Sequence, residues 1–412
     1  MGNFSRRSFL TRSVVGTGLA AMTGRLLAED APKIAGFDDT KTDVDATKVW
    51  TPKSDRKIKM GIVGYGVCQF GAAFGLQNHP NVEVVAVSDL FEDRRAALAQ
   101  VCRCEKTYPS LEEMIKDDSI EAIFCATDAP SHADHCIKVL ESGKHVATAV
   151  PAVFGNLEDA ERVFEAVKKS GLTYMMFETS TFHDDVYATR TLYEAGLLGR
   201  MLYSEGEYYH FGCEQIDSYK GWRIGLPPQW YPTHSNAYYT CATHGSFTEV
   251  SCMGTRNEAG LKGGAIEAYY PDKNAYQNPF GTEIALFRTS EGGTARMGVS
   301  WDTPGWGGET GRSRAELGSF AGDFQTQIDD VREKVAAMNL KKPALPPGVD
   351  AGGHGGSHGY LGNDFVESIL EKRKPIVDVA TALNTTVAGI VAHQSALKDG
   401  ELMKIPQFQY PF

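Results

Sequence analysis

The first part of this chain predicts an α/β fold with a doubly wound parallel sheet, and three observations lead to that prediction. An apolar run at 58–63 enters directly into Gly64-Tyr65-Gly66. A second run, 82–87, is rich in β-branched residues and ends at Ser88-Asp89. Strand-like and helix-like segments then alternate as far as residue 149. Such alternation is typical of parallel strands joined by helical crossovers.

The glycine turn after the first run is typical of a site for a dinucleotide pyrophosphate. Glycines let the backbone turn tightly and approach phosphate oxygens, and the helix expected over 70–76 offers free N–H groups and a partial positive charge. The third glycine of the usual fingerprint is missing, because Gln69 stands in its place and Gly71 comes two residues later. We expect four residues of the turn to hold a cofactor: Gly64, Tyr65, Gly66 and Val67.

Asp89 follows the second strand, where it can accept hydrogen bonds from the ribose hydroxyls of an adenosine. A carboxylate at this point favours NAD over the 2′-phosphorylated cofactor, whereas the nearby Arg94 and Arg95 would suit the phosphate. A second interpretation makes Asp89 the N-cap of the next helix. The sequence therefore predicts NAD as the cofactor.

Further segments continue the α/β order. Ser110 caps an acidic helix that runs through Ile115. Beyond it we expect a strand at 120–126, a helix at 131–142 and a strand at 145–149. Ligands of doubly wound sheets lie beyond the carboxyl ends of the strands. Four residues of the following loops are therefore expected to face the cofactor: Thr127, His132, Val150 and Pro151.

The composition is that of an ordinary globular protein with room for two domains, since 42% of the 412 residues are hydrophobic and 23% are charged. A formal net charge of −11 argues against nucleic acid as a partner, because nucleic-acid-binding surfaces need clustered Lys and Arg. The eight cysteines are scattered and lack both a disulfide framework and paired zinc-ligand spacing. We therefore expect no metal.

The N-terminus predicts a twin-arginine signal peptide over 1–28. Ser5-Arg6-Arg7-Ser8-Phe9-Leu10 contains the paired arginines, and a weakly apolar stretch follows at 14–22. The alternative is a disordered basic N-terminus. Polar residues over 29–56 indicate a linker or an arm on the surface. We expect the twin-arginine export machinery to deliver the protein to the periplasm or another extracytoplasmic space.

Four motifs occur in a fixed order along the chain: G-I-V-G-Y-G at 61–66, A-T-D-A-P-S-H at 126–132, G-K-H-V at 143–146 leading to Pro151, and M-F-E at 176–178. Together they resemble the glucose-fructose oxidoreductase and inositol dehydrogenase family (Gfo/Idh/MocA). The resemblance implies a Rossmann domain with a nicotinamide cofactor at 57–180. It also implies a substrate-binding domain at 181–412 with a large, mainly antiparallel open sheet, through which the chain forms a dimer or tetramer. Glu178 would contact the nicotinamide ribose, with a salt bridge as the alternative.

One position departs from that family. Most members have a lysine before the proline, and it positions or deprotonates the substrate hydroxyl, whereas Val150 can neither move a proton nor donate a hydrogen bond. A similar valine occurs in the NAD-dependent glycoside hydrolases of the α-N-acetylgalactosaminidase type, which also tend to have twin-arginine signals and share Tyr231-Pro232-Thr233-His234. Those hydrolases oxidise a sugar hydroxyl, eliminate the aglycone, add water and return the hydride. Such a cycle suits an exported protein that retains its NAD.

The second domain contains the remaining candidates. After a strand expected at 201–211, aromatic residues cluster in an irregular segment, as they do in sugar sites, although a structural loop pinned by aromatics is the alternative. The expected substrate contacts are His210, Trp222, Arg223, Trp230 and Thr233. Further strands are expected at 283–288, 295–301 and 315–321, and helices at 360–371 and 380–396, the last packing back on the first domain.

His234 is the best candidate for a general acid or base, because an imidazole exchanges protons near neutral pH and the resemblance places it beside the nicotinamide. Tyr231 is a second candidate. His183 is a third, and it could equally cap the following helix. The glycines between His354 and His358 argue against a zinc-binding helix and favour a flexible pocket edge.

Three functions follow from these observations. The first is an NAD-dependent oxidoreductase that acts on a sugar or glycoside CH–OH with a tightly retained cofactor. The second is a redox-neutral, NAD-dependent glycoside hydrolase or lyase. The third is a non-enzymatic NAD-binding protein, which the missing lysine would permit.

Overall fold

The computed structural model describes residues 42, 44–45, 47–258 and 272–412, which all fall within one compact unit. The predicted signal at 1–28 and part of the predicted linker at 29–56 lie outside these residues. None of the described helices has the length and apolar character that a membrane span requires.

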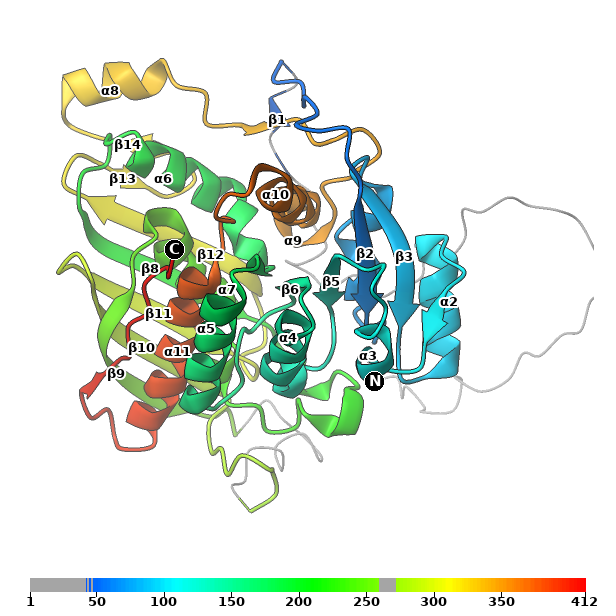
Figure 1. The fold of residues 1–412 in the computed structure, drawn as a ribbon. Coiled ribbons are helices and arrows are strands. Elements are labelled where there is room, and N and C mark those ends of the chain that lie inside the picture. Colours follow the sequence, from blue (N-terminus) through cyan, green and yellow to red (C-terminus); the bar gives the residue numbers. More distant parts are fainter. Residues whose placement is uncertain (1–41, 43, 46, 259–271) are drawn as a thin grey trace, which may run out of the picture. The chain divides into compact units, whose positions relative to one another are not determined.

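The first part of the described chain forms a six-stranded parallel sheet in the order β4-β3-β2-β5-β6-β7 (Figure 1). Its strands are β2 (Ile58–Val63), β3 (Val82–Ser88), β4 (Thr107–Tyr108), β5 (Ala122–Cys125), β6 (His145–Thr148) and β7 (Tyr174–Met176). The strands are short apolar runs, as expected where helices cover both faces of a sheet. The strand order reverses between β2 and β5, which is where ligand crevices open in doubly wound sheets.

The helices that connect these strands are α1 (Phe70–Ala73), α2 (Glu92–Cys102), α3 (Leu111–Met114), α4 (His132–Glu141) and α5 (Leu157–Ser170). The predicted cap is confirmed, because Oγ of Ser110 accepts a hydrogen bond from the Glu113 N–H. The helix predicted over 70–76 is too long. It ends at Ala73 because Gly75 adopts a left-handed conformation, with φ 69°, and a short 3₁₀ turn follows.

The second sheet has eight strands within the described residues, in the order β14-β13-β12-β8-β11-β10-β9-β16. They are β8 (Met201–Tyr209), β9 (Phe247–Thr255), β10 (Thr282–Thr289), β11 (Thr294–Ser300), β12 (Gly308–Ala315), β13 (Ser319–Phe320), β14 (Phe324–Gln325) and β16 (Met403–Lys404). β8 and β11 are parallel and the other recorded neighbours are antiparallel. The predicted large, mainly antiparallel sheet is therefore present.

One predicted strand of this sheet is wrong. The segment 315–321 is not a single strand, because the Ala315 N–H donates to the Gly318 carbonyl at 2.8 Å and closes a tight turn between β12 and β13. The strand that matters begins earlier, at Gly308. In consequence, sequence reasoning overlooked Glu309, which lies on the covered face of this strand with its side chain 1% exposed.

The remaining helices are α6 (Asp184–Glu194), α7 (Thr233–Thr243), α8 (Asp329–Ala336), α9 (Gly353–Gly356), α10 (His358–Glu371) and α11 (Val379–Ala396). α7 contacts β8, β11 and β12, and every residue of α7 is buried. α11 contacts β9 and α7 and also reaches α5 and β7 of the first sheet. Its N-cap, Asp378, accepts hydrogen bonds from the N–H groups of Ala380 and Thr381.

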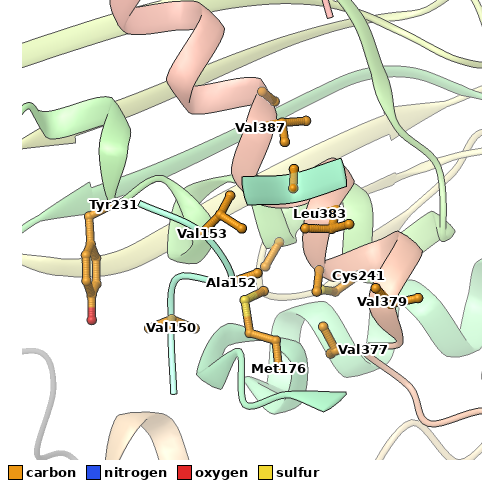
Figure 2. Packing of buried hydrophobic residues seen from close by; sticks show 14 of the residues in the cluster. Val150, Ala152, Val153, Met176, Tyr231, Cys241, Val377, Val379, Leu383 and Val387 are labelled. Carbon is orange, nitrogen blue, oxygen red and sulfur yellow. The ribbon is translucent and has the colours of Figure 1, made fainter. Parts of the chain in front are cut away.

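A continuous hydrophobic cluster joins the two sheets. Figure 2 shows Val150 and Val153 after β6 together with Met176 of β7, Leu383 of α11 and Cys241 of α7. The described part of the N-terminal arm also contacts the body: β1 (Val44–Asp45) pairs in parallel with β15 (Lys342–Pro343). Helices α7 and α11, which pack on the second sheet, thus also pack against the loop that follows β6 of the first sheet.

Candidate cofactor and active site

A cavity opens at the carboxyl ends of β2, β3, β5 and β6, and the second domain supplies one of its walls. Ten residues predicted to contact cofactor or substrate, or to catalyse, line it: Gly64, Tyr65, Gly66, Val67, Asp89, Thr127, Val150, Trp222, Arg223 and Tyr231. The second-domain wall includes the segment Ile216–Tyr219. Eight other predicted residues do not line it: Pro151, His132, Glu178, His183, His210, Trp230, Thr233 and His234.

The glycine turn is shaped for close approach. Gly64 has φ 98°, and a Cβ atom there would overlap the carbonyl oxygen of Ala126. At Gly66, by contrast, a Cβ would meet no described atom within 4 Å, so the missing side chain leaves open space beside the cavity. A Cβ at Gly71 would overlap the Gly64 carbonyl oxygen. Gly71 therefore permits the close packing of helix on strand that the third glycine of the usual fingerprint provides.

The Asp89 carboxylate is fixed at the cavity wall. Its Oδ2 accepts the Tyr65 N–H at 2.7 Å and its Oδ1 accepts the Phe91 N–H at 2.9 Å. Asp89 is not a helix cap, since Phe91 holds the N-cap position of α2. Arg95 donates to the Asp89 carbonyl at 2.8 Å, and Arg94 lies over the Phe91 ring. A carboxylate at this point suits ribose hydroxyls and repels a 2′-phosphate, so the residues fit NAD.

His132 joins two loops behind the cavity. Its Nδ1 lies 2.8 Å from the Pro151 carbonyl oxygen and its Nε2 lies 3.1 Å from that of Thr127. Burial lowers the pKa of His132. His135, one helical turn later, lines the cavity instead, with Nδ1 2.9 Å from the Thr127 hydroxyl. The spacing of three residues on α4 was the available signal for this histidine, and sequence reasoning missed it.

His234 and Glu178 form a buried ion pair behind Tyr231. Nδ1 of His234 lies 2.9 Å from Oε1 of Glu178, and the two side chains are 3% and 0% exposed. Glu178 also accepts the Ser180 N–H at 2.9 Å, which fixes the carboxylate at the start of a 3₁₀ turn. Of the two interpretations of Glu178, the geometry matches the salt bridge. Thr233, the first residue of α7, is buried next to His234.

The electrostatic surroundings keep His234 protonated. Burial by itself lowers the pKa of the imidazole, but the Glu178 and Glu309 carboxylates together raise it to about 9. For Glu178, burial raises the pKa, and the neighbouring His234 outweighs that effect and lowers it. At neutral pH the pair is therefore an imidazolium and a carboxylate. With Nδ1 bound to Glu178, Nε2 is the ring atom available to a ligand.

His183 neither lines the cavity, as a catalytic residue would, nor caps α6 with its side chain. It occupies the N-cap position of α6, but its side chain makes no capping hydrogen bond. Its Nε2 instead lies 3.1 Å from Oε2 of Glu309, a carboxylate on β12 whose Oε1 is 3.7 Å from Nδ1 of His234. The structure therefore brings His183 close to His234, beneath the cavity wall rather than on its surface.

The predicted aromatic segment divides into two groups. Tyr231 stacks with Trp222, with an angle of 21° between the rings, and Arg223 lies 4.4 Å over the Trp222 ring, so these three form one cavity wall. Burial raises the pKa of Tyr231. His210 lies near this wall, and burial followed by the Arg223 charge lowers its pKa to about 4. Trp230 does not belong to this wall.

Trp230 matches the alternative interpretation, a loop pinned by aromatics. Its ring packs edge to face against Phe154, Tyr276 and His393, with centroid separations of 5.4, 5.2 and 5.7 Å. A Cβ atom at Gly155 would lie 2.5 Å from this ring. Trp230 therefore supports the segment that carries Tyr231, and it does not reach the cavity.

His354 and His358 bind each other. Nε2 of His358 lies 2.9 Å from Nδ1 of His354, and His354 has a left-handed backbone, with φ 51°. The ring centroid of His354 is 6.1 Å from that of His234. Within the described residues, no three or more His, Cys, Asp or Glu side chains are arranged to hold a metal ion.

Comparison with known proteins agrees with this fold. Residues 58–178 match the family model described as "Oxidoreductase family, NAD-binding Rossmann fold" (GFO_IDH_MocA). Two solved structures with TM-scores of 0.65 share the fold. The WlbA dehydrogenase from Bordetella pertussis, in complex with NADH and UDP-GlcNAcA, is 16% identical and covers 87% of this chain and 100% of its own. Levoglucosan dehydrogenase, in complex with NADH and levoglucosan, is 18% identical and covers 86% of this chain and 100% of its own.

Curated relatives are similar over a shorter stretch. "Glycosyl hydrolase family 109 protein 1" of Bacteroides thetaiotaomicron is 26% identical over 212 residues, 49% of this chain and 44% of the relative. "Glycosyl hydrolase family 109 protein" of Porphyromonas gingivalis is 24% identical over 206 residues, 47% and 42%. The chain spans less than half the length of these two relatives. Residues 58–178 thus match the NAD-binding Rossmann domain of the Gfo/Idh/MocA oxidoreductase family, and the cofactor of this domain is NAD.

Proposed function

We propose that this protein is an NAD-dependent oxidoreductase that acts on a CH–OH group of a sugar or glycoside and keeps its cofactor tightly bound. The observation on which the proposal depends is the wall of Trp222, Arg223 and Tyr231 facing the end of β6, with the His234–Glu178 pair directly behind it. Aromatic faces pack on the C–H surfaces of sugars, and charged neighbours bond the hydroxyls. The names of the solved relatives, which include a levoglucosan complex, are consistent with such a substrate.

The residues at the cavity divide the work of holding NAD. The open space at Gly66 would admit the pyrophosphate, Asp89 would accept hydrogen bonds from the ribose hydroxyls, and Val150 would present an apolar surface to the reacting end. When bound, NAD supplies a hydride acceptor for the substrate carbon. The protein supplies the proton transfers, and Val150 has no part in them.

His234 is the group we assign to proton transfer. Held by Glu178 at Nδ1, it directs Nε2 away from the pair, and as an imidazolium it donates a hydrogen bond or a proton to a substrate oxygen. It can accept a proton only after it has lost one. Tyr231, with its pKa raised by burial, acts as a hydrogen-bond donor rather than as a base.

A redox-neutral glycoside hydrolase is the second candidate, and two observations favour it. Val150 stands where the sequence resemblance implies a lysine, and Tyr231-Pro232-Thr233-His234 is the segment on which the resemblance to such hydrolases rests. The curated relatives are also named as glycosyl hydrolases. In this cycle the substrate is oxidised, loses its aglycone, gains water and is reduced again. The cofactor then need never leave. A non-enzymatic protein would have no use for a buried His–Glu pair directly behind the cavity wall.

Retention of the cofactor is supported by the segment Ile216–Tyr219. It closes the cavity from the second domain, and the Tyr219 ring packs edge to face on Phe91 at 6.1 Å, beside Asp89 and Arg94. We call this segment the strap. An adenosine between the strap and the first sheet would be covered on both sides, which slows release.

Export through the twin-arginine pathway to the periplasm also belongs to this proposal, because a retained cofactor is what an enzyme needs where free NAD is scarce. A homo-oligomer belongs to it as well. On the uncovered face of the second sheet, Leu286 is 53% exposed and Met253 is 61% exposed. An ion pair of Arg296 and Glu207 lies on the same face. A mixed apolar and charged face of this kind suits a second copy.

The test begins with the full chain, purified without added nucleotide, denatured and assayed for NAD. About one NAD per chain is expected. The holoprotein is then incubated in D₂O with a panel of 4-nitrophenyl glycosides, including the N-acetyl-α-D-galactosaminide, and with unsubstituted sugars. Aglycone release with deuterium beside the oxidised carbon identifies the hydrolase, and NADH formation without release identifies the oxidoreductase. A protein empty of NAD that binds it weakly would contradict both.

A further inference from the structure

Two carboxylate–imidazole pairs lie next to each other behind Tyr231, and only one of them is used in the function proposed above. In the first pair, Nδ1 of His234 is 2.9 Å from Glu178. In the second, Nε2 of His183 is 3.1 Å from Oε2 of Glu309. The pairs touch through Glu309, whose Oε1 is 3.7 Å from Nδ1 of His234. That oxygen accepts no hydrogen bond from the described residues.

Ser180 fixes both carboxylates at once. Its N–H donates to Glu178 at 2.9 Å, and its hydroxyl donates to Oε2 of Glu309 at 2.5 Å. The four side chains of the two pairs come from separate elements, namely the end of β7, the start of α6, α7 and β12. Since a single serine orients both acids, their relative position is set by the fold and not by mobile surface side chains.

With both carboxylates ionised and only His234 protonated, the four side chains leave one negative charge uncompensated. Glu178 and Glu309 contribute two negative charges, and the His234 imidazolium compensates one of them. Burying the remaining charge is costly unless it is paired. His183, whose side chain is 12% exposed and which lies at ion-pair distance from Glu309, is placed to provide the second positive charge when it is protonated.

We infer that Glu309 and His183 extend the His234–Glu178 pair into a four-membered charge network. Glu309 is a positioning residue: its carboxylate, oriented by Ser180, adds a second negative charge beside His234, and His183 adds a second positive charge beside Glu309 when it is protonated. The use of the network in catalysis rests on the proposed function, because the charge on Glu309 decides how readily His234 gives its proton to a substrate oxygen.

Other charged or titratable groups also face the network, and they stay in place in every variant below. His354 approaches His234 from α9, and His210 follows β8. Arg223 acts on His234 from the cavity wall, and Asp185 lies next to His183 on α6. They set a common background against which the contribution of Glu309 and His183 is measured.

The experiment is a pH titration of the histidine ring resonances by NMR, on the full NAD-containing protein labelled with ¹³C and ¹⁵N at histidine. H234N and H183N assign the two signals. We expect E309Q to lower the pKa of His234 by about one pH unit or more, because an opposite charge is removed at close range. H183N should raise it, because Glu309 loses its other cation. E207Q, on the uncovered face of β8, is the matched control and should leave the pKa of His234 unchanged.

Opposite shifts in E309Q and H183N would establish the network, since loss of packing alone would not produce them. Unchanged values, or shifts of the same sign, would overturn it. Should E309Q not fold, S180A removes the hydroxyl that donates to Glu309 and that also lies 3.1 Å from the His234 carbonyl oxygen, and this variant is expected to shift the same resonance. The titration needs no substrate, so opposite shifts without glycoside turnover would refute the proposed function alone. Turnover without such shifts would refute only the network.

Discussion

The two ends of the cavity are built in different ways. At the adenosine end, Gly64, Gly66 and Asp89 lie within one strand–turn–helix–strand unit and act largely through the backbone and a single carboxylate. At the reacting end, Glu178 and His234 are 56 residues apart in sequence and meet beneath a wall from the second domain. The cofactor half is therefore encoded locally, while the catalytic half exists only once the whole chain has folded.

The largest expected difference between the ends comes from His234. H234N should lower the turnover of whichever glycoside or sugar the panel identifies by about 10²- to 10⁴-fold, because the proton-transferring group is lost, while the NAD content remains about one per chain. Steady-state kinetics and the NAD assay measure the two quantities on one sample. Loss of NAD together with activity would show that the two ends are not separable.

A pair of glycine variants tests the adenosine end. G64A should destabilise the protein by about 2 kcal/mol or more, since the φ of 98° is unfavourable for alanine and its Cβ would overlap the Ala126 carbonyl. G66A meets no described atom within 4 Å, so without NAD it should have the melting temperature of NAD-free wild type, while it binds NAD more weakly. Thermal unfolding and NAD titration of both variants give the comparison. Equal melting temperatures for the two would refute the assigned roles.

The buried ion pair predicts a stability that depends on pH. The pKa of His234 is raised from 6.5 to about 9, so its contribution of about 3 kcal/mol is fully present below pH 6.5 and is lost as the pH rises through 9. The lowered pKa of Glu178 acts in the other direction, with stability lost only in acid. Urea unfolding between pH 6 and 10 checks the alkaline limb. In H234N that limb should be flatter.

The smallest expected effect concerns the strap. Y219A removes the ring that packs on Phe91 and should speed NAD release by about tenfold, equivalent to about 1.4 kcal/mol. Release is followed by trapping the freed NAD with an excess of a second dehydrogenase. Y410A is the control, because its ring packs on Phe412 and does not line the cavity. If Y219A and Y410A released NAD at the same rate, the strap would not explain the retention of NAD.

The sequence predicts the cofactor end of the cavity better than the reacting end. The first sheet, its glycine turn and Asp89 are recognisable because strand, turn and helix are consecutive. Glu309 was missed because the strand that carries it, β12, has glycine at Gly308 and Gly311 and charged residues on its exposed face, which hide the alternation of a half-buried strand. His132 was predicted to face the cofactor and His135 was not considered, although His135 is the histidine of α4 that lines the cavity, whereas His132 joins the loops behind it.

The helix α11 has a consequence for recombining this protein with its relatives. It touches β9 and α7 on one side and α5 and β7 on the other. A chimera that exchanges only the Rossmann half at residue 180 would therefore set a foreign surface, in place of Val150 and Val153, against Leu383 of α11. A functional exchange of the cofactor domain therefore requires that α11 be exchanged together with the Rossmann half that it contacts.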